Sequence, residues 1–564
     1  MPQSIVPPTQ PKQYVVELPS SQESISGLSN LKQSDVEKNL STGGRKVVTL
    51  DEFQLAELKR QNPAAIVFEN ARVHVPSPEE LGAKPVFDVV EPGQQGAVGP
   101  QAINQNIVVH GADKLHEQGI KGNSSPFSPI VVTVDTGVAP HKFLESDQRG
   151  LKFWDVFDNK EEAWNDGHNH GTHVSGIMFA DSANQKGMAP DANFIGVKVL
   201  DDTGNGTIAS VMSGLEKAAA YYDEIAKPAG RPMVLNMSLG DDEVPPTAQD
   251  ELHKKLKEIL DARPGMVIAI AAGNAGPGAN TIGTPGNFQH PQAVTVAAAN
   301  TRGTISMDDD TAATFSSRGG NDVSKGQDAL RNGGIMADGS NVVSTVGSGT
   351  SLQSMSGTSM ASPHVAGAAA LLYDLAGKMQ AEGTLKVPLT EINPLKLLRE
   401  SALDHANINA DIEGAGELDV AKAAKLLVER YGNTEGPTDP TPVETKKTAT
   451  PNLPIGDLQT VTSTLDVPEA MKLTNATVDL DIGHTWRGDL VVSLIAPSGK
   501  EIVLANKEGG SADNVTGSFD VSEALKGESA QGTWTLKVAD TARQDVGTLK
   551  SWSLNLKGTA PQPQ

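Results

Sequence analysis

The middle of the chain alternates continuous apolar runs with amphipathic helical patterns, and this alternation limits the folds that are open to it. Between the runs, residues 208–219 and 252–260 repeat apolar side chains at helical spacing. Strands that are apolar on both faces are typical of parallel sheets covered by helices on both sides. The pattern predicts a doubly wound α/β domain with its active site beyond the carboxyl ends of the strands. The runs, each long enough for one strand, are residues 130–134, 194–200, 233–239, 266–272 and 293–299.

The two ends of the chain have different patterns. Near the N-terminus, residues 13–18 and 65–69 predict strands and residues 50–61 predict a helix, which together indicate a small α+β unit. The C-terminal piece has short alternating runs separated by Gly, Pro and Asp turns, a pattern that predicts an antiparallel β-sandwich. These runs are residues 476–482, 490–495, 534–538 and 551–556.

Two stretches have the composition of linkers. Residues 93–104 are rich in Gly, Gln and Pro, and residues 432–454 carry prolines and threonines without an apolar period. The predicted domains are therefore residues 1–92, 105–431 and 455–564.

Composition excludes several classes of function. With 46 Lys or Arg against 69 Asp or Glu, the net charge is −23, which argues against binding nucleic acid or an anionic membrane surface. The chain has no cysteine, so disulfides, zinc–thiolate sites and cysteine nucleophiles are excluded. No stretch approaches the ~20 apolar residues of a membrane span. The first residues lack the apolar core of a secretory signal, so we expect a cytoplasmic monomer, with leaderless secretion left open.

Three reactive side chains lie at predicted strand or helix ends. Asp135 ends the first apolar run, His170 opens a glycine-bearing turn into a helix, and Ser359 precedes a helix of small residues. A serine becomes a nucleophile when an imidazole takes its proton, and that imidazole needs a carboxylate to orient it. Asp135, His170 and Ser359 can fill these three roles if the fold brings them together.

Each of these residues also has a simpler interpretation. A lone Asp at a strand tip is usually a turn residue, and a lone Ser before a helix is usually an N-cap. His168, His170 and His173 are so close in sequence that spacing does not identify the base, and they could instead form a metal site. Asn274, after another apolar run, adds a candidate amide donor for an oxyanion beside the Ser359 backbone N–H.

Five segments taken together resemble one known family. VTVDTG, HGTHVSG, NMSLG, AAGN and GTSMASPHVAG, in this order across residues 105–430, closely resemble the subtilisin-like serine proteases. The order Asp, His, Ser agrees with that resemblance, whereas α/β-hydrolases have the order Ser, Asp, His and a G-x-S-x-G turn. The resemblance selects His170 as the base and implies a serine endopeptidase that acts on polypeptides through an acyl-enzyme. Asp338 departs from the pattern, because the family commonly has proline there.

The resemblance also implies where a substrate binds. Subtilisin-like clefts hold an extended peptide as an added strand between two backbone edges. Here the edges are residues 204–206 and 238–240, and the binding residues are Gly204, Gly206, Ser238, Leu239 and Gly240, with Gly283 at the floor of the first specificity pocket. Acidic residues follow both edges, at 201–202 and 241–243, so we expect a preference for basic side chains before the scissile bond. The alternative is that these carboxylates are ordinary solvated loop residues.

The C-terminal piece has a resemblance of its own. DIGHTWRGDL, SLIAPSGK, GTWTLKVAD and GTLKSWSLNL, within residues 455–558, resemble the P domain of proprotein convertases. This likeness favours basic cleavage sites, and the lack of cysteine fits bacterial proteases with the same pairing of domains. Asp481, Asp489 and Asp540 offer the oxygen ligands that calcium prefers. We expect structural calcium but assign no ligands, because the three residues suit turns equally well.

The N-terminal piece resembles a subtilase propeptide over residues 13–78, which implies an intramolecular inhibitor that blocks the cleft until it is cut away. Two other functions stay open. One is a catalytically silent protease-like scaffold that acts as a calcium-dependent protein-binding module. The other is an esterase that uses the same triad.

Overall fold

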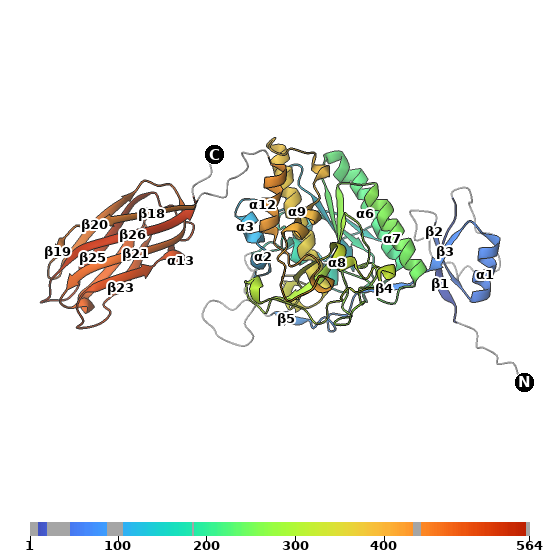
Figure 1. Cartoon of the computed structure of the whole chain (residues 1–564), viewed down its shortest axis with the longest axis horizontal. Helices are drawn as coiled ribbons and strands as arrows, with labels where there is room; N and C mark the ends of the chain where they lie inside the picture. Colours follow the sequence, from blue (N-terminus) through green and yellow to red (C-terminus); the bar gives the residue numbers. More distant parts are fainter. Residues whose placement is uncertain (1–9, 20–44, 87–104, 183–184, 433–441, 560–564) are drawn as a thin grey trace, which may run out of the picture. The chain divides into compact units, whose positions relative to one another are not determined.

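The computed structural model describes residues 10–19, 45–86, 105–182, 185–432 and 442–559 (Figure 1). The chain divides into two compact units, residues 1–436 and 437–564. The linker expected at residues 93–104 lies outside the described residues. Within the described ranges, no helix combines the length and the apolar character needed to cross a membrane.

The first unit contains a nine-stranded sheet with the strand order β14-β13-β12-β11-β6-β9-β7-β8, and β15 pairs with β13. All neighbouring strands are parallel except the short edge strands β8 and β14. Each predicted apolar run forms a strand, whereas β7, β8, β14 and β15 were not expected. The strands are β6 (Ile130–Asp135), β7 (Gly150–Asp155), β8 (Lys160–Glu161), β9 (Asn193–Lys198), β11 (Met233–Met237), β12 (Met266–Ala271), β13 (Ala293–Asn300), β14 (Thr311–Ala312) and β15 (Ile335–Asp338).

Helices cover both faces of this sheet, as the apolar runs predict. In β6, Val131 belongs to one core and its neighbours Ile130 and Val132 belong to the other. Figure 1 shows α6 (Ile208–Tyr221) and α7 (Pro246–Asp261) on one side and α9 (Thr358–Ala381) on the other. The remaining helices of this part are α2 (Gln105–Val109), α3 (Ala112–His116), α4 (Ser146–Arg149), α5 (His170–Phe179), α8 (Ala329–Gly333), α10 (Pro394–Ser401), α11 (Ala410–Glu413) and α12 (Val420–Tyr431).

The N-terminal residues form an antiparallel sheet with the order β2-β1-β3 and one helix. The two expected strands and the expected helix are present, and β2 is an addition that the sequence did not predict. Val15, Val47 and Phe68 from this sheet join the core that α6 and α7 share with the large sheet. The elements are β1 (Lys12–Glu17), β2 (Arg45–Leu50), α1 (Glu52–Gln61) and β3 (Ile66–Glu69).

The chain then runs along the large sheet's domain in two short strands. β4 (Arg72–His74) pairs antiparallel with β10 (Asn205–Thr207). β5 (Lys84–Val86) pairs with β17 (Leu352–Met355), which also pairs with β16 (Val342–Thr345). Residues 72–86 are therefore anchored at both ends to the domain that carries the predicted active site.

The second unit consists of two antiparallel sheets, β18-β26-β21-β24 with β19 beside β26, and β20-β25-β22-β23. They share one core, in which the side chains of Trp534 and Trp552 are fully buried. The elements are β18 (Pro442–Ala449), β19 (Leu453–Ile455), β20 (Thr460–Val467), β21 (Lys472–His484), β22 (Leu490–Ile495), β23 (Glu501–Asn506), β24 (Val515–Asp520), α13 (Ser522–Leu525), β25 (Gly532–Asp540) and β26 (Gly547–Thr559).

The expected linker at residues 432–454 is too long at its C-terminal end. Residues 442–449 and 453–455 form β18 and β19, and both pair with β26. β18 is an edge strand, where prolines and lysines are tolerated because one side of the strand needs no partner. Its composition therefore looks like that of a spacer although it belongs to the sandwich.

Candidate active site

The predicted reactive residues meet where the strand order of the large sheet reverses. From β6 the sheet continues to β9 and β7 in one direction, and from β11 to β12 and β13 in the other. Asp135 is the last residue of β6, Ser238 follows β11, and Asn274 follows β12. In open α/β sheets, such a reversal leaves a crevice beyond the carboxyl ends of the strands.

Asp135 and His170 form a buried pair. The Nδ1 atom of His170 lies 2.7 Å from Oδ1 of Asp135, and neither side chain is exposed. A carboxylate only accepts, so Nδ1 carries the proton of this hydrogen bond and the neutral ring keeps its lone pair on Nε2. That Nε2 is buried and has no hydrogen-bond partner in the described part of the chain. It is therefore free to accept a proton.

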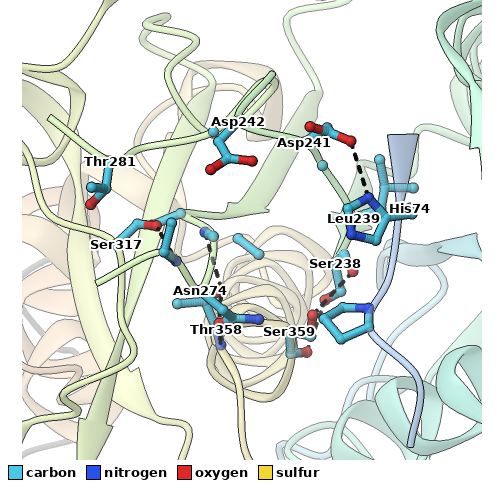
Figure 2. Close-up of a pocket in the computed structure, with 17 residues that line it drawn as sticks. His74, Ser238, Leu239, Asp241, Asp242, Asn274, Thr281, Ser317, Thr358 and Ser359 are labelled. Carbon is cyan, nitrogen blue, oxygen red and sulfur yellow. Dashed lines mark hydrogen bonds and ion pairs between the residues drawn. The ribbon is translucent and has the colours of Figure 1, made fainter. Parts of the chain in front are cut away.

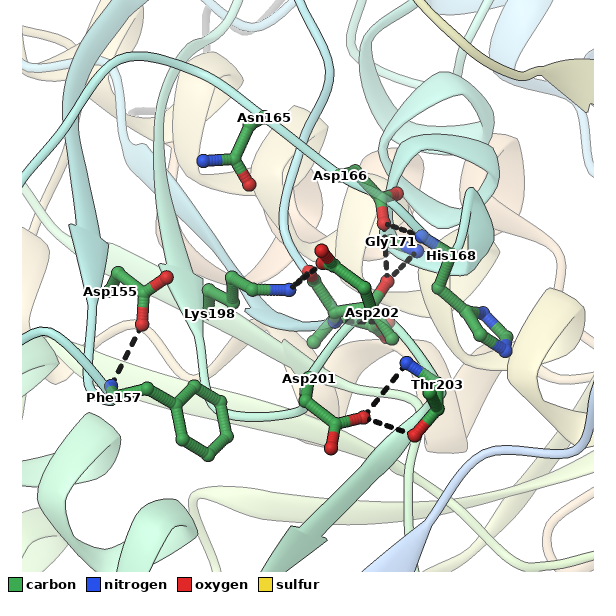
Figure 3. A network of polar contacts seen from close by, with 12 residues as sticks. Asp155, Phe157, Asn165, Asp166, His168, Gly171, Lys198, Asp201, Asp202 and Thr203 are labelled. Carbon is green, nitrogen blue, oxygen red and sulfur yellow. Dashed lines mark hydrogen bonds and ion pairs between the residues drawn. The ribbon is translucent and has the colours of Figure 1, made fainter.

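Asp166 fixes the turn that delivers His170 (Figure 3). Its Oδ1 accepts from the Thr136 hydroxyl and from the N–H groups of His168 and Asn169, and its Oδ2 accepts from the N–H and hydroxyl of Thr172. One carboxylate thus ties the loop after β6 to the first turn of α5. Gly171 completes this fit, because a Cβ there would lie 2.1 Å from the Gly137 carbonyl oxygen.

Lys198 supports the same loop from the neighbouring strand. Its ammonium donates to the Thr136 carbonyl at 2.6 Å and to Asp202 at 2.8 Å (Figure 3). The hydrogen bond from Lys198 is the largest cause that holds the pKa of the Asp202 carboxyl below its ordinary value. The carboxylate of Asp202 is therefore occupied within the protein.

Ser359 lies in the first turn of α9, where the backbone N–H groups have no partner within the helix. Its hydroxyl donates to the Ser238 carbonyl at 3.2 Å, and the Ser238 hydroxyl donates back to the Ser359 carbonyl at 2.9 Å. The hydroxyl of Ser359 is thus directed to a carbonyl oxygen rather than hydrogen-bonded to His170. A change in the side-chain rotamer is needed before proton transfer to Nε2.

Asn274 is held by one end of its amide. Its Oδ1 accepts from the Thr358 N–H at 2.9 Å and from the Thr358 hydroxyl at 3.0 Å. The Nδ2 end donates to no residue in the described ranges, and Asn274 and Ser359 line the same cavity (Figure 2). The amide is therefore oriented with a free donor beside the serine.

The other two histidines of the cluster have separate surroundings. His173 donates from Nε2 to the Gln353 carbonyl at 2.9 Å, and burial lowers its pKa to about 3. Burial also lowers the pKa of His168, whose ring centroid is 6.2 Å from that of His170. Among the described residues, no group of three His, Cys, Asp or Glu could hold a metal ion. Contact with Asp135 distinguishes His170 from its neighbours.

A cavity of about 240 Å³ opens beside Ser359 (Figure 2). Ser238, Leu239, Gly240 and Gly283, four of the residues proposed from the sequence to bind substrate, line it. A Cβ at Gly283 would come within 3.1 Å of the Asp241 carbonyl oxygen, so glycine keeps this wall close-packed. Asp241 and Asp242, which the sequence singled out as acids behind one edge, also line the cavity. Other lining residues, which the sequence did not identify, include Thr281, Ser317, His74 and Pro76.

A segment of the chain's own N-terminal region lies between the two predicted substrate edges. His74 and Gly240 exchange two backbone hydrogen bonds of 3.2 Å, and the Val75 N–H donates to the Gly204 carbonyl at 3.0 Å. Gly206 pairs with Val73 in the adjoining β4–β10 ladder. This segment forms the added strand that the sequence analysis expected of a peptide ligand.

The acidic residues behind the two edges differ in what they contact. Asp201 accepts from the N–H and hydroxyl of Thr203 and from the Asn205 N–H. Asp202 is paired with Lys198, so both carboxylates beside residues 204–206 already have hydrogen-bond partners within the protein. Only Asp241 and Asp242, of the acids considered at the two edges, line the cavity.

The three aspartates considered for calcium do not form a common site. Asp481 lies 3.7 Å from the Lys550 ammonium, and Asp540 lies 3.4 Å from His484 with both side chains buried. The carbonyl of Asp489 accepts from Thr541. Among the described residues no group of three or more His, Cys, Asp or Glu could hold a metal ion, so the structure assigns none of these three side chains as a calcium ligand.

Comparison with known proteins agrees with the geometry. The model of the subtilase family matches residues 128–412, and that of the proprotein convertase P-domain matches residues 473–556. Serine protease AprX of Bacillus subtilis is 37% identical over 261 residues, which are 43% of this chain and 56% of that protein. A calcium-dependent protease of Trichormus variabilis is 28% identical over 502 residues, which are 82% of this chain and 70% of that protein.

Subtilisin E of Bacillus subtilis is 31% identical over 367 residues, which are 64% of this chain and 80% of that protein. The match to AprX thus spans little more than half of that relative's length. The family match covers half of the present chain and contains the buried Asp135–His170 pair together with Asn274 and Ser359. The chain belongs to the subtilase family of serine proteases and carries a proprotein convertase P-domain in its second unit.

Proposed function

We propose that the protein is a serine endopeptidase that cleaves polypeptides through an acyl-enzyme on Ser359. The observation that carries this proposal is the buried Asp135–His170 contact, which leaves His170 Nε2 without a partner. In the first step the Ser359 hydroxyl turns from the Ser238 carbonyl to Nε2. Its oxygen then attacks the substrate carbonyl while Nε2 takes the proton, and Asp135 stabilises the imidazolium.

The negative charge that forms on the substrate oxygen is held by the Asn274 Nδ2–H and the Ser359 backbone N–H. When the tetrahedral intermediate collapses, the C–N bond breaks and His170 returns its proton to the leaving amine. A water molecule then attacks the acyl-enzyme, with His170 again as the base, and releases the acid product and free Ser359. Atoms and protons balance over the two steps.

We propose a preference for Lys or Arg immediately before the scissile bond. Asp242 is exposed and lines the cavity beside Ser359, where a cationic side chain of the substrate would meet its carboxylate (Figure 2). Peptides with Arg at that position should be cleaved faster than matched peptides with Leu. Asp242→Asn should reduce the difference, and a preference for Leu in the unmodified protein would reject this part of the proposal.

We also propose that residues 1–92 act as an intramolecular inhibitor of the catalytic residues 105–431. The supporting observation is the pairing of residues 72–75 with both substrate edges. A peptide bound in those edges would need the same backbone groups of Gly204 and Gly240. Substrate and segment therefore compete for one site.

The proposal is tested by Ser359→Ala, which should abolish peptide hydrolysis and labelling by a serine-reactive phosphonate while the protein stays folded. Ser362→Ala is the matched control, since Ser362 lies on the same helix but its hydroxyl bonds to Asn236. Full activity of Ser359→Ala would contradict the proposal. A protein without activity on peptides but with partner binding would be the silent scaffold, and one that hydrolyses esters alone would be the esterase.

A further inference from the structure

One carboxylate beside the cleft contacts the segment that occupies it. Oδ2 of Asp241 lies 3.1 Å from Nδ1 of His74 (Figure 2). The Asp241 side chain is 13% exposed and that of His74 is 35% exposed, so the contact is partly shielded from water. The His74 imidazole is therefore one side chain that binds to the Asp241 carboxylate, and it belongs to the chain itself.

The backbone hydrogen bonds of residues 74 and 75 indicate which residue of a bound peptide would take the place of His74. His74 pairs with Gly240, and Val75 donates to the Gly204 carbonyl. Pro76 is the next residue and lines the cavity together with Ser359. If Pro76 takes the position immediately before the scissile bond, His74 takes the third position before it. A substrate strand that uses the same hydrogen bonds would place its third residue against Asp241.

The position of Asp241 is fixed before any ligand arrives. Its backbone exchanges two hydrogen bonds of 2.9 Å with Thr284, and its Oδ1 accepts from the Glu243 N–H at 2.8 Å. This leaves Oδ2 for the side chain of the bound strand. Asp201 and Asp202 are different, because their carboxylates bond to their own loop and to Lys198.

The charge of Asp241 suits a cationic partner. Burial acts to raise the pKa of its carboxyl, but the hydrogen bonds from His74 and from the Glu243 N–H outweigh burial, with further help from the charges of His74 and Arg72. The pKa therefore lies below its ordinary value. An ionised, partly buried carboxylate with one free acceptor is a selective contact for a positively charged donor.

We propose that Asp241 determines specificity at the third residue before the scissile bond and favours Lys, Arg or protonated His there. This inference rests on the proposed endopeptidase function and assigns a second selective position to it, at a different carboxylate from that of Asp242. The substrate class is a polypeptide with basic residues in the first and third positions before the cut.

The first experiment uses the full-length chain and peptides that are identical except for Lys, Ala or Glu at the third position. The kcat/KM of the Lys peptide should exceed that of the Ala peptide roughly 3- to 10-fold, because a partly exposed ion pair contributes modestly. The Glu peptide should be the slowest. Asp241→Asn should bring the three values together, whereas Glu243→Gln, a change at an exposed neighbouring acid, should leave the ratios as they are.

The second experiment needs no turnover. In a Ser359→Ala background, amide hydrogen exchange at residues 72–75 should be faster with Asp241→Asn or His74→Ala and unchanged with His74→Lys or Glu243→Gln. Equal exchange in the Asp241→Asn and parent proteins, or unchanged peptide ratios in Asp241→Asn, would overturn the role of Asp241. If no peptide is cleaved while exchange follows Asp241, the endopeptidase proposal fails and the role of Asp241 in binding a basic segment stands.

Discussion

His170 Nδ1 lies 2.7 Å from Asp135 Oδ1 within a site where both side chains have no solvent exposure. The carboxylate fixes the ring tautomer, so the buried Nε2 is the nitrogen that can take a proton. Ser359 meanwhile donates to the Ser238 carbonyl. The acid–base pair is therefore assembled before the nucleophile turns toward it.

Asp135→Asn should lower kcat roughly 10⁴-fold, because an amide that donates to Nδ1 favours the tautomer with its proton on Nε2. KM should change little, since Asp135 lies outside the predicted substrate edges. Steady-state kinetics on a peptide substrate check this, with thermal unfolding as the control for folding. A loss of activity below tenfold would show that the carboxylate does not orient the base.

Asp166→Asn should impair both the fold and the rate. Five donors converge on the Asp166 carboxylate, and an amide would oppose two of them with its own N–H groups. We expect a loss of about 2 kcal/mol in the free energy of unfolding and a fall in kcat of roughly 10- to 100-fold through displacement of His170. Urea denaturation and kinetics measure these, with Asp158→Asn, at an exposed acid, as the matched control.

Pro76→Arg should make the chain a better substrate for itself. Pro76 lines the cavity that contains Asp242, but its ring brings no charge to that carboxylate. Arginine should accelerate cleavage between residues 76 and 77 by roughly tenfold. Intact mass and N-terminal sequencing over time detect the new end at Ser77.

Two control variants make that result specific. Pro78→Arg should give no acceleration, because Pro78 is not among the residues that line the cavity. Adding Ser359→Ala to Pro76→Arg should abolish the cut. Rapid turnover of added peptides without any cut after residue 76 would show that Pro76 does not occupy the position before the scissile bond.

Asp338→Asn should make stability less dependent on pH. Burial is the main cause that raises the pKa of Asp338 to about 7 in the folded protein. At pH values below the ordinary carboxyl pKa, Asp338 is protonated in both the folded and the unfolded protein. In that pH range its burial therefore costs no ionisation free energy. As the pH rises toward 7, the unfolded chain loses the proton first, and folding stability falls.

At ~1.4 kcal/mol per pKa unit, this loss amounts to about 4 kcal/mol and is complete once the pH passes 7. Urea midpoints between pH 4 and pH 8 should therefore fall in the parent protein and fall less in Asp338→Asn. Glu417 is a second buried acid, and burial together with the charge of Asp310 raises its pKa above the ordinary value, so part of the slope should persist in Asp338→Asn. Identical slopes in both proteins would contradict the assignment to Asp338.

Much of the site follows from local sequence. Asp135 and Asn274 come directly after buried apolar strands, and parallel strands bring their carboxyl ends to one edge of the sheet. Ser359 lies in the first turn of a long helix rich in small residues, which packs against that sheet. The family resemblance supplied the choice of His170 among three histidines, which spacing alone does not make.

Other features depend on contacts between distant parts of the chain. His74 and Asp241 are 167 residues apart, and nothing in either local sequence indicates that they meet. The rotamer of Ser359 depends on the Ser238 carbonyl, whose position comes from another strand. The local sequence also does not show what Asp338 contacts where the family commonly has proline. Its N–H donates to His110 at 3.2 Å, and a proline, which has no N–H, could not make this bond.

The segment of residues 72–75 belongs to the same polypeptide as the cleft in which it lies. A tethered ligand acts at a fixed effective concentration, which for flexible tethers is on the order of millimolar, and diluting the protein does not change it. One cut downstream of residue 76 would convert this arrangement into a bimolecular complex whose occupancy falls on dilution. If residues 1–92 act as the proposed inhibitor, the contacts of this strand would close the cleft at any protein concentration before the cut and only where the released piece stays abundant after it.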